Sequence, residues 1–169
     1  MIPASQLRSP SAESATLDQP LEHLLACHRR IEQRLDSLLR AAHAIESRPE
    51  EARTAIANVL RFLSSSGAWH TEDEERSLFP RLRARGLTGE DDAYLRELES
   101  QHHRVEALVE RLRDAAPDGF AALADETARA YRDHIAFEEA RLIGVARTAL
   151  TAADLAEISG EMKSRRGIA

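Results

Sequence analysis

Apolar residues recur along the chain at alternating steps of three and four, which is the repeat of an amphipathic α-helix. Four long stripes of this kind follow one another. They comprise Leu21, Leu24, His28, Ile31, Leu35, Leu38 and Ala42; Ile56, Val59, Leu63, Ser66, His70, Glu74 and Leu78; Leu95, Leu98, His102, Val105, Val109 and Leu112; and Leu123, Thr127, Tyr131, His134, Glu138, Leu142 and Val145. A shorter pattern follows with Leu155, Ile158 and Met162. We therefore predict an all-α protein, an up-down-up-down four-helix bundle with a short C-terminal fifth helix.

Residues that favour helix ends and turns separate these stripes. Asp18 followed by Pro20 predicts the start of the first helix, and Ser47-Arg-Pro-Glu50 resembles a capping box for the second. We expect the second helix to stop or kink near Pro80 and to be ended by Gly86, because proline lacks a backbone donor and glycine tolerates a left-handed conformation. The remaining signals are a cap at Thr88, a turn at residues 117–119 and a cap at Thr151.

The composition agrees with a helical protein of one domain. The chain has 169 residues, of which 43% are hydrophobic and only 4% aromatic, and a chain of this length can bury a substantial core. The first sixteen residues are polar and lack a helical pattern, so we expect residues 1–16 to form a flexible leader. Residues 17–169 then form the folded domain.

The charge and the cysteine content narrow the partners and the compartment. A formal net charge of −6 argues against nucleic acid or an anionic membrane surface as the main partner. Cys27 is the only cysteine, which excludes an intramolecular disulfide and favours the cytoplasm. We expect neither a secretory signal nor a membrane span, since no apolar run is long enough. The sequence does not indicate the oligomeric state.

Four histidines occupy positions where a helical core usually places leucine, one in each long stripe. Two of them are followed four residues later by a glutamate, as His70 with Glu74 and His134 with Glu138. Residues at this spacing lie on one helix face about 6 Å apart, so each pair directs an imidazole and a carboxylate to the same place. This combination of donors is typical of a metal site.

The chain also repeats this arrangement. Residues 27–32 resemble residues 101–106, and residues 69–80 resemble residues 133–144. Two similar halves favour a site with approximate twofold symmetry. A single histidine on an apolar stripe is usually a hydrogen-bonded core residue, but a dimetal site would satisfy all the buried donors together. We therefore predict as metal ligands His28, His70, Glu74, His102, His134 and Glu138.

Several neighbouring residues leave alternatives open. Glu32 and Glu106 lie four residues after His28 and His102 and can serve as a seventh ligand, as orienting partners of an imidazole or as flanking charges; we favour the last two. Glu75 is turned away from His70 by a step of five, as Glu139 is from His134, so we expect a solvent-exposed or an orienting carboxylate at each. The remaining histidines are expected at the boundary, for His103, and at the surface, for His23 and His43.

These motifs resemble the hemerythrin-like family, also called the HHE cation-binding domain, over roughly residues 17–148. The marks are His28, the run His70-x-x-x-Glu74-Glu75 followed by Leu-Phe-Pro, then His102, and the run His134-x-x-x-Glu138-Glu139. The resemblance implies a four-helix bundle around two non-haem iron ions with an oxo or hydroxo bridge. It further implies that His28 and His70 hold one iron, that His102 and His134 hold the other, and that Glu74 and Glu138 bridge them.

One position departs from the oxygen-carrying members of that family, which have His-x-x-x-His on the third helix. Here the same spacing gives His102 and Glu106, which argues against reversible oxygen carriage. We expect a di-iron protein that binds and reduces or dismutates small oxidants such as peroxide, oxygen or nitric oxide. The alternatives are a module for iron or oxygen binding, sensing or iron-centre repair without turnover, and a purely structural bundle. Whether the protein is an enzyme stays open at this point.

Overall fold

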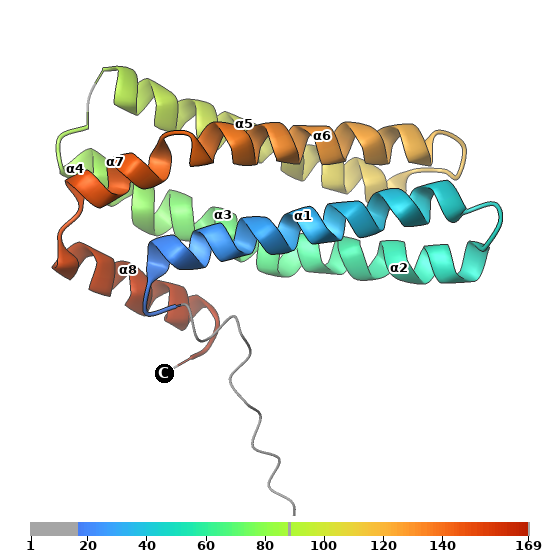
Figure 1. Ribbon diagram of the computed structural model, residues 1–169, viewed down its shortest axis with the longest axis horizontal. Coiled ribbons are helices and arrows are strands. Elements are labelled where there is room, and N and C mark those ends of the chain that lie inside the picture. Colours follow the sequence, from blue (N-terminus) through green and yellow to red (C-terminus); the bar gives the residue numbers. More distant parts are fainter. Residues whose placement is uncertain (1–16, 88, 169) are drawn as a thin grey trace, which may run out of the picture.

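The fold is described by a computed structural model, which covers residues 17–87 and 89–168 and is helical throughout, with no β-strand in these ranges (Figure 1). The all-α prediction is thus confirmed. The α-helices are α1 (Pro20–Ala44), α2 (Pro49–Phe62), α3 (Ala68–Asp73), α4 (Phe79–Ala84), α5 (Glu90–Asp114), α6 (Phe120–Glu139), α7 (Leu142–Ala149) and α8 (Ala152–Arg165). Two π-helical segments are η2 (Leu63–Gly67) and η3 (Glu74–Leu78). The predicted leader, residues 1–16, and the predicted cap Thr88 lie outside the described residues.

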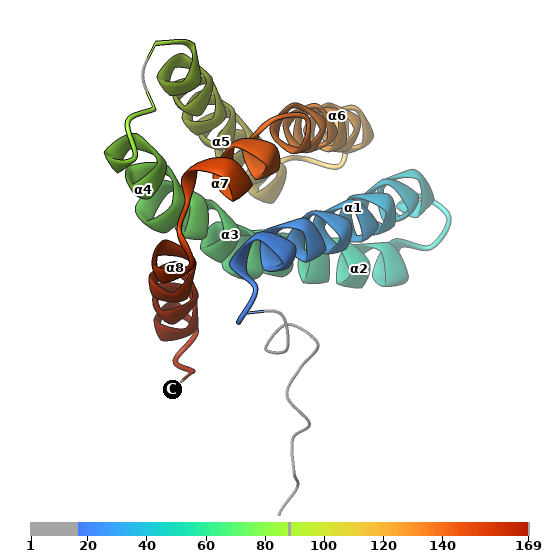
Figure 2. The same cartoon turned by 60° about the vertical axis from the view of Figure 1, so that its left-hand side comes forward.

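The long helices run side by side along the molecule (Figure 1). Helix α1 packs against α2 and α6, and α5 packs against α6. The turns between α1 and α2 and between α5 and α6 lie at one end, whereas α4, α7 and α8 lie at the other (Figures 1 and 2). Helix α8 packs across α3, η3 and α1 rather than extending the bundle. No helix in the described part of the chain is both long and apolar enough to cross a membrane.

The second predicted helix is a series of α-helical and π-helical segments from Pro49 to Ala84. A π segment accommodates an additional residue in the helix and occurs frequently at functional sites. Segment η2 ends shortly before His70, and η3 begins at Glu74. The helix continues through Pro80, which has no N–H to donate to an α-helical hydrogen bond. The first π segment therefore precedes the predicted ligand His70, and the second contains the predicted ligand Glu74.

The predicted capping box at Ser47 is wrong. Helix α2 begins at Pro49, its N-cap is Arg48, and no side chain caps it. The residue before a proline is disfavoured in the helical conformation, and Arg48 has φ −140° and ψ 66°, so the helix cannot begin earlier. The Ser47 hydroxyl instead donates to the Ala44 carbonyl at the end of α1. The predicted cap at Thr151 is confirmed, with reciprocal hydrogen bonds between Thr151 and Asp154.

The fourth predicted helix is broken after the motif glutamate. Helix α6 ends at Glu139, and α7 begins at Leu142. The Tyr94 hydroxyl donates to the carbonyl oxygens of Phe137 and Glu138 at 2.9 and 3.0 Å. Carbonyls in the last turn of a helix lack the full set of intrahelical partners; the single Tyr94 hydroxyl hydrogen is shared between these two, and the Glu138 carbonyl also accepts from the Arg141 N–H at 3.1 Å. The stripe through Leu142 therefore continues on a separate helix.

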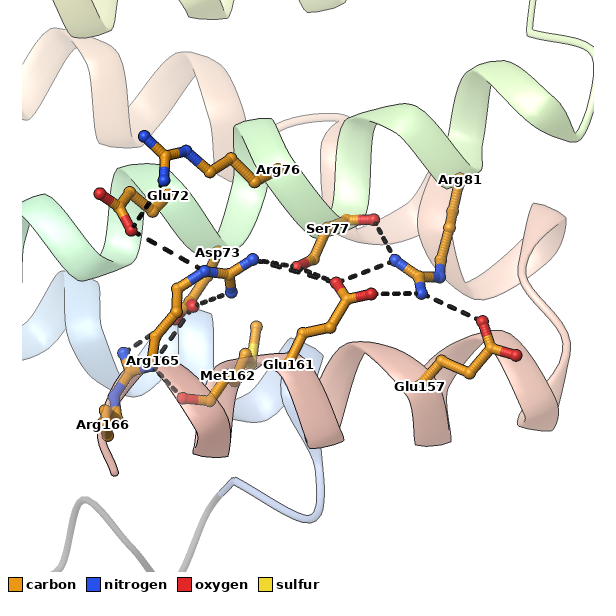
Figure 3. Close-up of polar contacts among 10 residues, drawn as sticks. All are labelled: Glu72, Asp73, Arg76, Ser77, Arg81, Glu157, Glu161, Met162, Arg165 and Arg166. Carbon is orange, nitrogen blue, oxygen red and sulfur yellow. Dashed lines mark hydrogen bonds and ion pairs between the residues drawn. The ribbon is translucent and has the colours of Figure 1, made fainter. Parts of the chain in front are cut away.

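Helix α8 is attached to the bundle by a network of arginine and acidic side chains (Figure 3). Asp73, which is fully buried, accepts from Arg165 at 2.7 Å and from Arg166 at 2.8 Å. Farther along the same face, Arg81 donates to Glu161 at 2.8 Å and to Glu157 at 3.0 Å. Asp73 directly precedes Glu74 in the chain. The network therefore fixes the backbone next to one of the predicted ligands.

Two apolar clusters form the core. One contains Ile31, Leu35, Val105, Tyr131 and Ile135, among others, and extends toward the α1–α2 turn. The other contains Leu24, Leu78, Phe79, Leu98 and Leu142, among others, and extends toward α8. The buried histidines and glutamates of the predicted site occupy helix positions between these two sets of residues. The polar site is thus enclosed by hydrophobic side chains on both sides.

Candidate metal centre

The structure brings all six predicted ligands together in the interior of the bundle. Helix α1 contributes His28, the α3–η3 segment His70 and Glu74, α5 His102, and α6 His134 and Glu138. Each of these residues is at most 3% exposed. The donors of the two His-x-x-x-Glu pairs, which are distant in sequence, therefore lie close together in space.

The six side chains form two groups of possible metal donors that share both glutamates. One group is His28, His70, Glu74 and Glu138, and the other is Glu74, His102, His134 and Glu138. Within each group, one ligand atom from every residue lies within 4.8 Å of all the others. The two groups are alike in geometry, since the imidazole rings of each pair are 4.7 Å apart between centroids and nearly perpendicular. Sharing of the glutamates gives the arrangement of a carboxylate-bridged dimetal site.

Several donor atoms approach one another closely without forming hydrogen bonds, although the Nε2 atoms of His28 and His70 are 3.1 Å apart and share one. The His102 Nε2 atom lies 3.0 Å from Glu74 Oε2, and the His134 Nε2 atom lies 3.4 Å from Glu138 Oε2. Nevertheless, within residues 17–87 and 89–168 all four carboxylate oxygens of Glu74 and Glu138 are buried without a hydrogen-bond partner, as are Nε2 of His102 and of His134. A buried polar atom without a partner costs several kcal/mol. A cation within each group would satisfy these atoms, so the residues present fit a pair of metal ions.

Two further carboxylates hold the outer faces of the imidazoles. The Nδ1 atom of His28 lies 2.9 Å from Glu139 Oε1, and that of His102 lies 2.7 Å from Glu75 Oε1. A carboxylate on Nδ1 keeps the proton there and leaves Nε2 available to a metal. Of the roles considered for Glu75 and Glu139, the structure supports the orienting one.

The other two imidazoles are held differently. The Nδ1 atom of His134 lies 3.2 Å from the amide oxygen of Gln101, which is neutral. The Nδ1 atom of His70 is buried and has no hydrogen-bond partner in the structure. Each donor group therefore combines one imidazole backed by a carboxylate with one that is not.

Within the cluster, the pKa values of some buried groups are raised and those of others are lowered. Burial opposes protonation of His28 and His102, but the carboxylates of Glu138 beside His28 and of Glu74 beside His102 outweigh it and raise the pKa to about 9 for His28 and about 10 for His102. Burial lowers the pKa of His70 well below its ordinary value, and the charge of His28 adds to this. Burial also raises the pKa of Glu74, assisted by the charge of Glu138. Buried negative charge here thus requires positive charge beside it, which protons or metal ions can supply.

Comparison with known proteins agrees with this geometry. Residues 19–146 match the family described as hemerythrin HHE cation binding domain. The chain belongs to this family. It is also similar to an uncharacterized protein of Haemophilus influenzae, with 26% identity over 164 residues that cover 91% of this chain and 94% of that relative. The hemerythrin match includes all six clustered residues and ends before α8.

The other residues considered from the sequence lie outside the two donor groups. Glu32 pairs with Arg29 at 3.0 Å, and Glu106 is exposed, so neither reaches the cluster as a seventh ligand. His103 is exposed rather than at the boundary, and its Nδ1 lies 2.7 Å from the Glu99 carbonyl oxygen of its own helix. His43 is exposed, as predicted.

The prediction that His23 is a surface residue is wrong, because the structure buries it completely. Its Nε2 atom lies 3.7 Å from the Cys27 sulfur atom. Helix α8 packs against α1 and covers a side of the bundle that would otherwise face solvent. The sequence pattern of the first helix carries no signal for this contact, because the covering element comes from the other end of the chain.

Proposed function

We propose that this protein is a non-haem di-iron protein. His28 and His70 would hold one iron, His102 and His134 the other, and Glu74 and Glu138 would bridge the two. The observation that carries the proposal is that the four oxygens of the two shared glutamates are buried and unpartnered. A set of imidazole and carboxylate donors suits iron or manganese better than structural zinc, which prefers closed tetrahedral sites.

The side chains around the site would prepare it for redox chemistry. When bound, the irons would supply electrons and open positions for a small molecule. Glu75 and Glu139 would keep the Nδ1 protons on His102 and His28, so that the opposite nitrogens stay available. The apolar clusters on both sides would exclude bulk water, as the near-complete burial of the cluster indicates. An up-and-down order of the helices would place the donors of the two halves opposite each other.

We propose that the ligands are oxygen, peroxide or nitric oxide, and that the protein reduces or dismutates such oxidants in the cytoplasm. Residues 17–169 would be the functional domain, beside a leader of residues 1–16. The second candidate is binding or sensing of the same molecules without turnover. This binding function is favoured by a small void beside the site. Apart from the imidazoles, its wall offers only the hydroxyl groups of Thr71 and Tyr131.

Metal analysis of variants tests the ligand assignment. We expect the wild-type protein to bind two irons per chain, and His70→Ala combined with His134→Ala to lower bound iron sharply. His103→Ala is the matched control, because His103 is exposed and directly follows a proposed ligand. Retention of two irons by the double variant would contradict the proposal. Turnover of hydrogen peroxide or nitric oxide by the iron-loaded protein would support the enzyme, whereas reversible spectral change alone would support the binding module.

A further inference from the structure

A void in the bundle lies directly beside the proposed metal ligands. Its volume is about 10 Å³, which is the space needed for one water-sized molecule. His70 of one donor group and His102 and His134 of the other line it. The rest of its wall is mostly apolar and includes Ile31, Val105 and Ile135.

A larger cavity opens to the surface next to this void. It has a volume of about 310 Å³ and lies between the η2–α3 segment and α5, with Tyr131 of α6 also in its wall. The void and the cavity share a set of lining residues, namely Gly67, Thr71, Val105 and Tyr131. Both spaces therefore adjoin these four residues, which we call the throat.

The rim and the throat differ in chemistry. Glu106, Glu110 and Arg113 line the outer cavity, and Arg113 pairs with Glu110 at 3.0 Å and also contacts the Ser64 hydroxyl across the cavity. The rim thus carries one net negative charge. The throat carries no ionic side chain, since it consists of glycine, threonine, valine and tyrosine. Moving an ion through such a passage costs far more than moving a neutral molecule.

A second surface cavity, of about 220 Å³, lies between α5 and α6 and touches His134. It shares only Val105 and His134 with the void. Gln101 is in its wall and lies against the Nδ1 side of His134, so a molecule there meets the face of the imidazole opposite to Nε2. This cavity is the less suitable route to the donor atoms.

We propose that small neutral molecules reach the site through the cavity between η2–α3 and α5, and that Gly67, Thr71, Val105 and Tyr131 form the gate. This inference rests on the proposed function, because it concerns the ligands of the same site. It adds the route, the residues that control entry and the selection of neutral molecules over anions.

Gly67 offers a direct way to close the gate. Its φ of −64° is ordinary for a helix, and a Cβ atom there would meet its nearest neighbours, including the Phe62 carbonyl oxygen at 3.8 Å, at ordinary contact distance. Gly67→Leu would therefore place a larger side chain in the throat without straining the backbone. Ala130→Leu is the matched control, since Ala130 lines the second cavity and not the first.

The test measures association of nitric oxide with the anaerobic, iron(II)-loaded protein by stopped-flow absorbance. We expect Gly67→Leu to lower the association rate constant at least tenfold and Ala130→Leu to change it less than twofold, with unchanged iron content and final spectrum. An unchanged rate in Gly67→Leu, or slower association only in Ala130→Leu, would overturn the proposal.

A second measurement needs neither iron nor a variant. Methyl NMR of the metal-free protein under oxygen pressure reports where a neutral diatomic molecule resides, because oxygen is paramagnetic and broadens nearby signals. We expect stronger broadening at Val109, which lines the proposed route only, and at Ile135, which lines the void, than at Leu38, which is fully buried and lines neither cavity nor the void. Equal broadening at all three, or strong broadening at Ala130 without broadening at Val109, would refute the route. Failure of the protein to bind iron would count against the proposed function, and this NMR result would still decide the route.

Discussion

The carboxylates that follow the motif glutamates act across helices. A step of five turns Glu75 away from His70, as the spacing predicts, but it directs the carboxylate to His102 of α5, and Glu139 reaches His28 of α1 in the same way. Sequence periodicity describes the faces of a single helix. Periodicity therefore showed that Glu75 and Glu139 do not belong to the His-x-x-x-Glu pairs of their own helices. It could not show which residues of neighbouring helices they contact.

Removing either orienting carboxylate is predicted to weaken metal binding. Glu75→Ala and Glu139→Ala should each lower iron affinity by roughly 10-fold to 100-fold, because loss of such partners has this effect in other metal sites. Competition with a chelator of known affinity measures the change. Glu106→Ala is the matched control, since Glu106 is an exposed glutamate on the helix of His102. The iron affinity of this variant should stay within twofold of the wild-type affinity. An equal loss in the control would assign the effect to net charge rather than to the imidazole partner.

His23 is predicted to make stability depend on pH. Burial lowers its pKa from 6.5 to about 4, and the charges of Arg166 and Arg30 add to the effect. Between these values the unfolded chain binds a proton that the folded protein does not, so the free energy of unfolding decreases as the pH falls. The decrease from pH 6.5 to pH 5 is about 2 kcal/mol for this group.

Urea unfolding at several pH values isolates this contribution. The parent should lose about 2 kcal/mol of unfolding free energy through His23 as the pH falls from 6.5 to 5, whereas His23→Gln should not. The difference in unfolding free energy between the two proteins should therefore narrow by this amount. His43→Gln is the control, because His43 is exposed, and its difference from the parent should stay constant. A His23→Gln variant with the same pH slope as the parent would show that the buried imidazole does not set the dependence.

At the scale of helices, the sequence predicted where the elements lie better than how they end. The stripes located the long helices because each buries one apolar face. The π segments and the break after Glu139 leave no comparable signal, since they depend on contacts such as the Tyr94 hydroxyl on the Glu138 carbonyl. The predicted capping box at Ser47 and the predicted cap at Thr151 differ in outcome for a local reason, because Pro49 prevents a helix start at Ser47, whereas residues 151–154 contain no proline.

Helix α8 is predicted to depend on the buried Asp73. Asp73→Ala would remove the buried carboxylate that pairs with Arg166, whose side chain is 3% exposed, and breaking a buried ion pair in this way costs about 3–5 kcal/mol. Urea unfolding measures this loss. Glu157→Ala is the matched control on α8, because Glu157 is 68% exposed and pairs with Arg81 at the surface, where such a pair contributes at most about 1 kcal/mol. Similar losses in both variants would contradict a special role for the buried pair.

At the scale of the whole molecule, the bundle encloses a polar cluster between two apolar clusters. The sequence predicted this cluster because His28, His70, His102 and His134 interrupt apolar stripes, one in each long helix. It could not predict the void and the cavities, which depend on the packing of η2–α3 against α5. The gate residues Gly67 and Thr71 in particular have no distinctive spacing in the sequence.

Without metal, the cluster should lower the stability of the protein, because unpartnered buried carboxylates oppose folding. A metal that binds only the folded state stabilises it by mass action, by about 2.7 kcal/mol at a free concentration 100 times the Kd of one site. We therefore predict that Tm rises with iron(II) concentration under anaerobic conditions and falls again when a chelator is added. His103→Ala should behave like the wild type, whereas His70→Ala combined with His134→Ala should lose the dependence. A wild-type Tm that is unaffected by iron would instead favour a purely structural bundle, in which protons balance the buried carboxylates of Glu74 and Glu138.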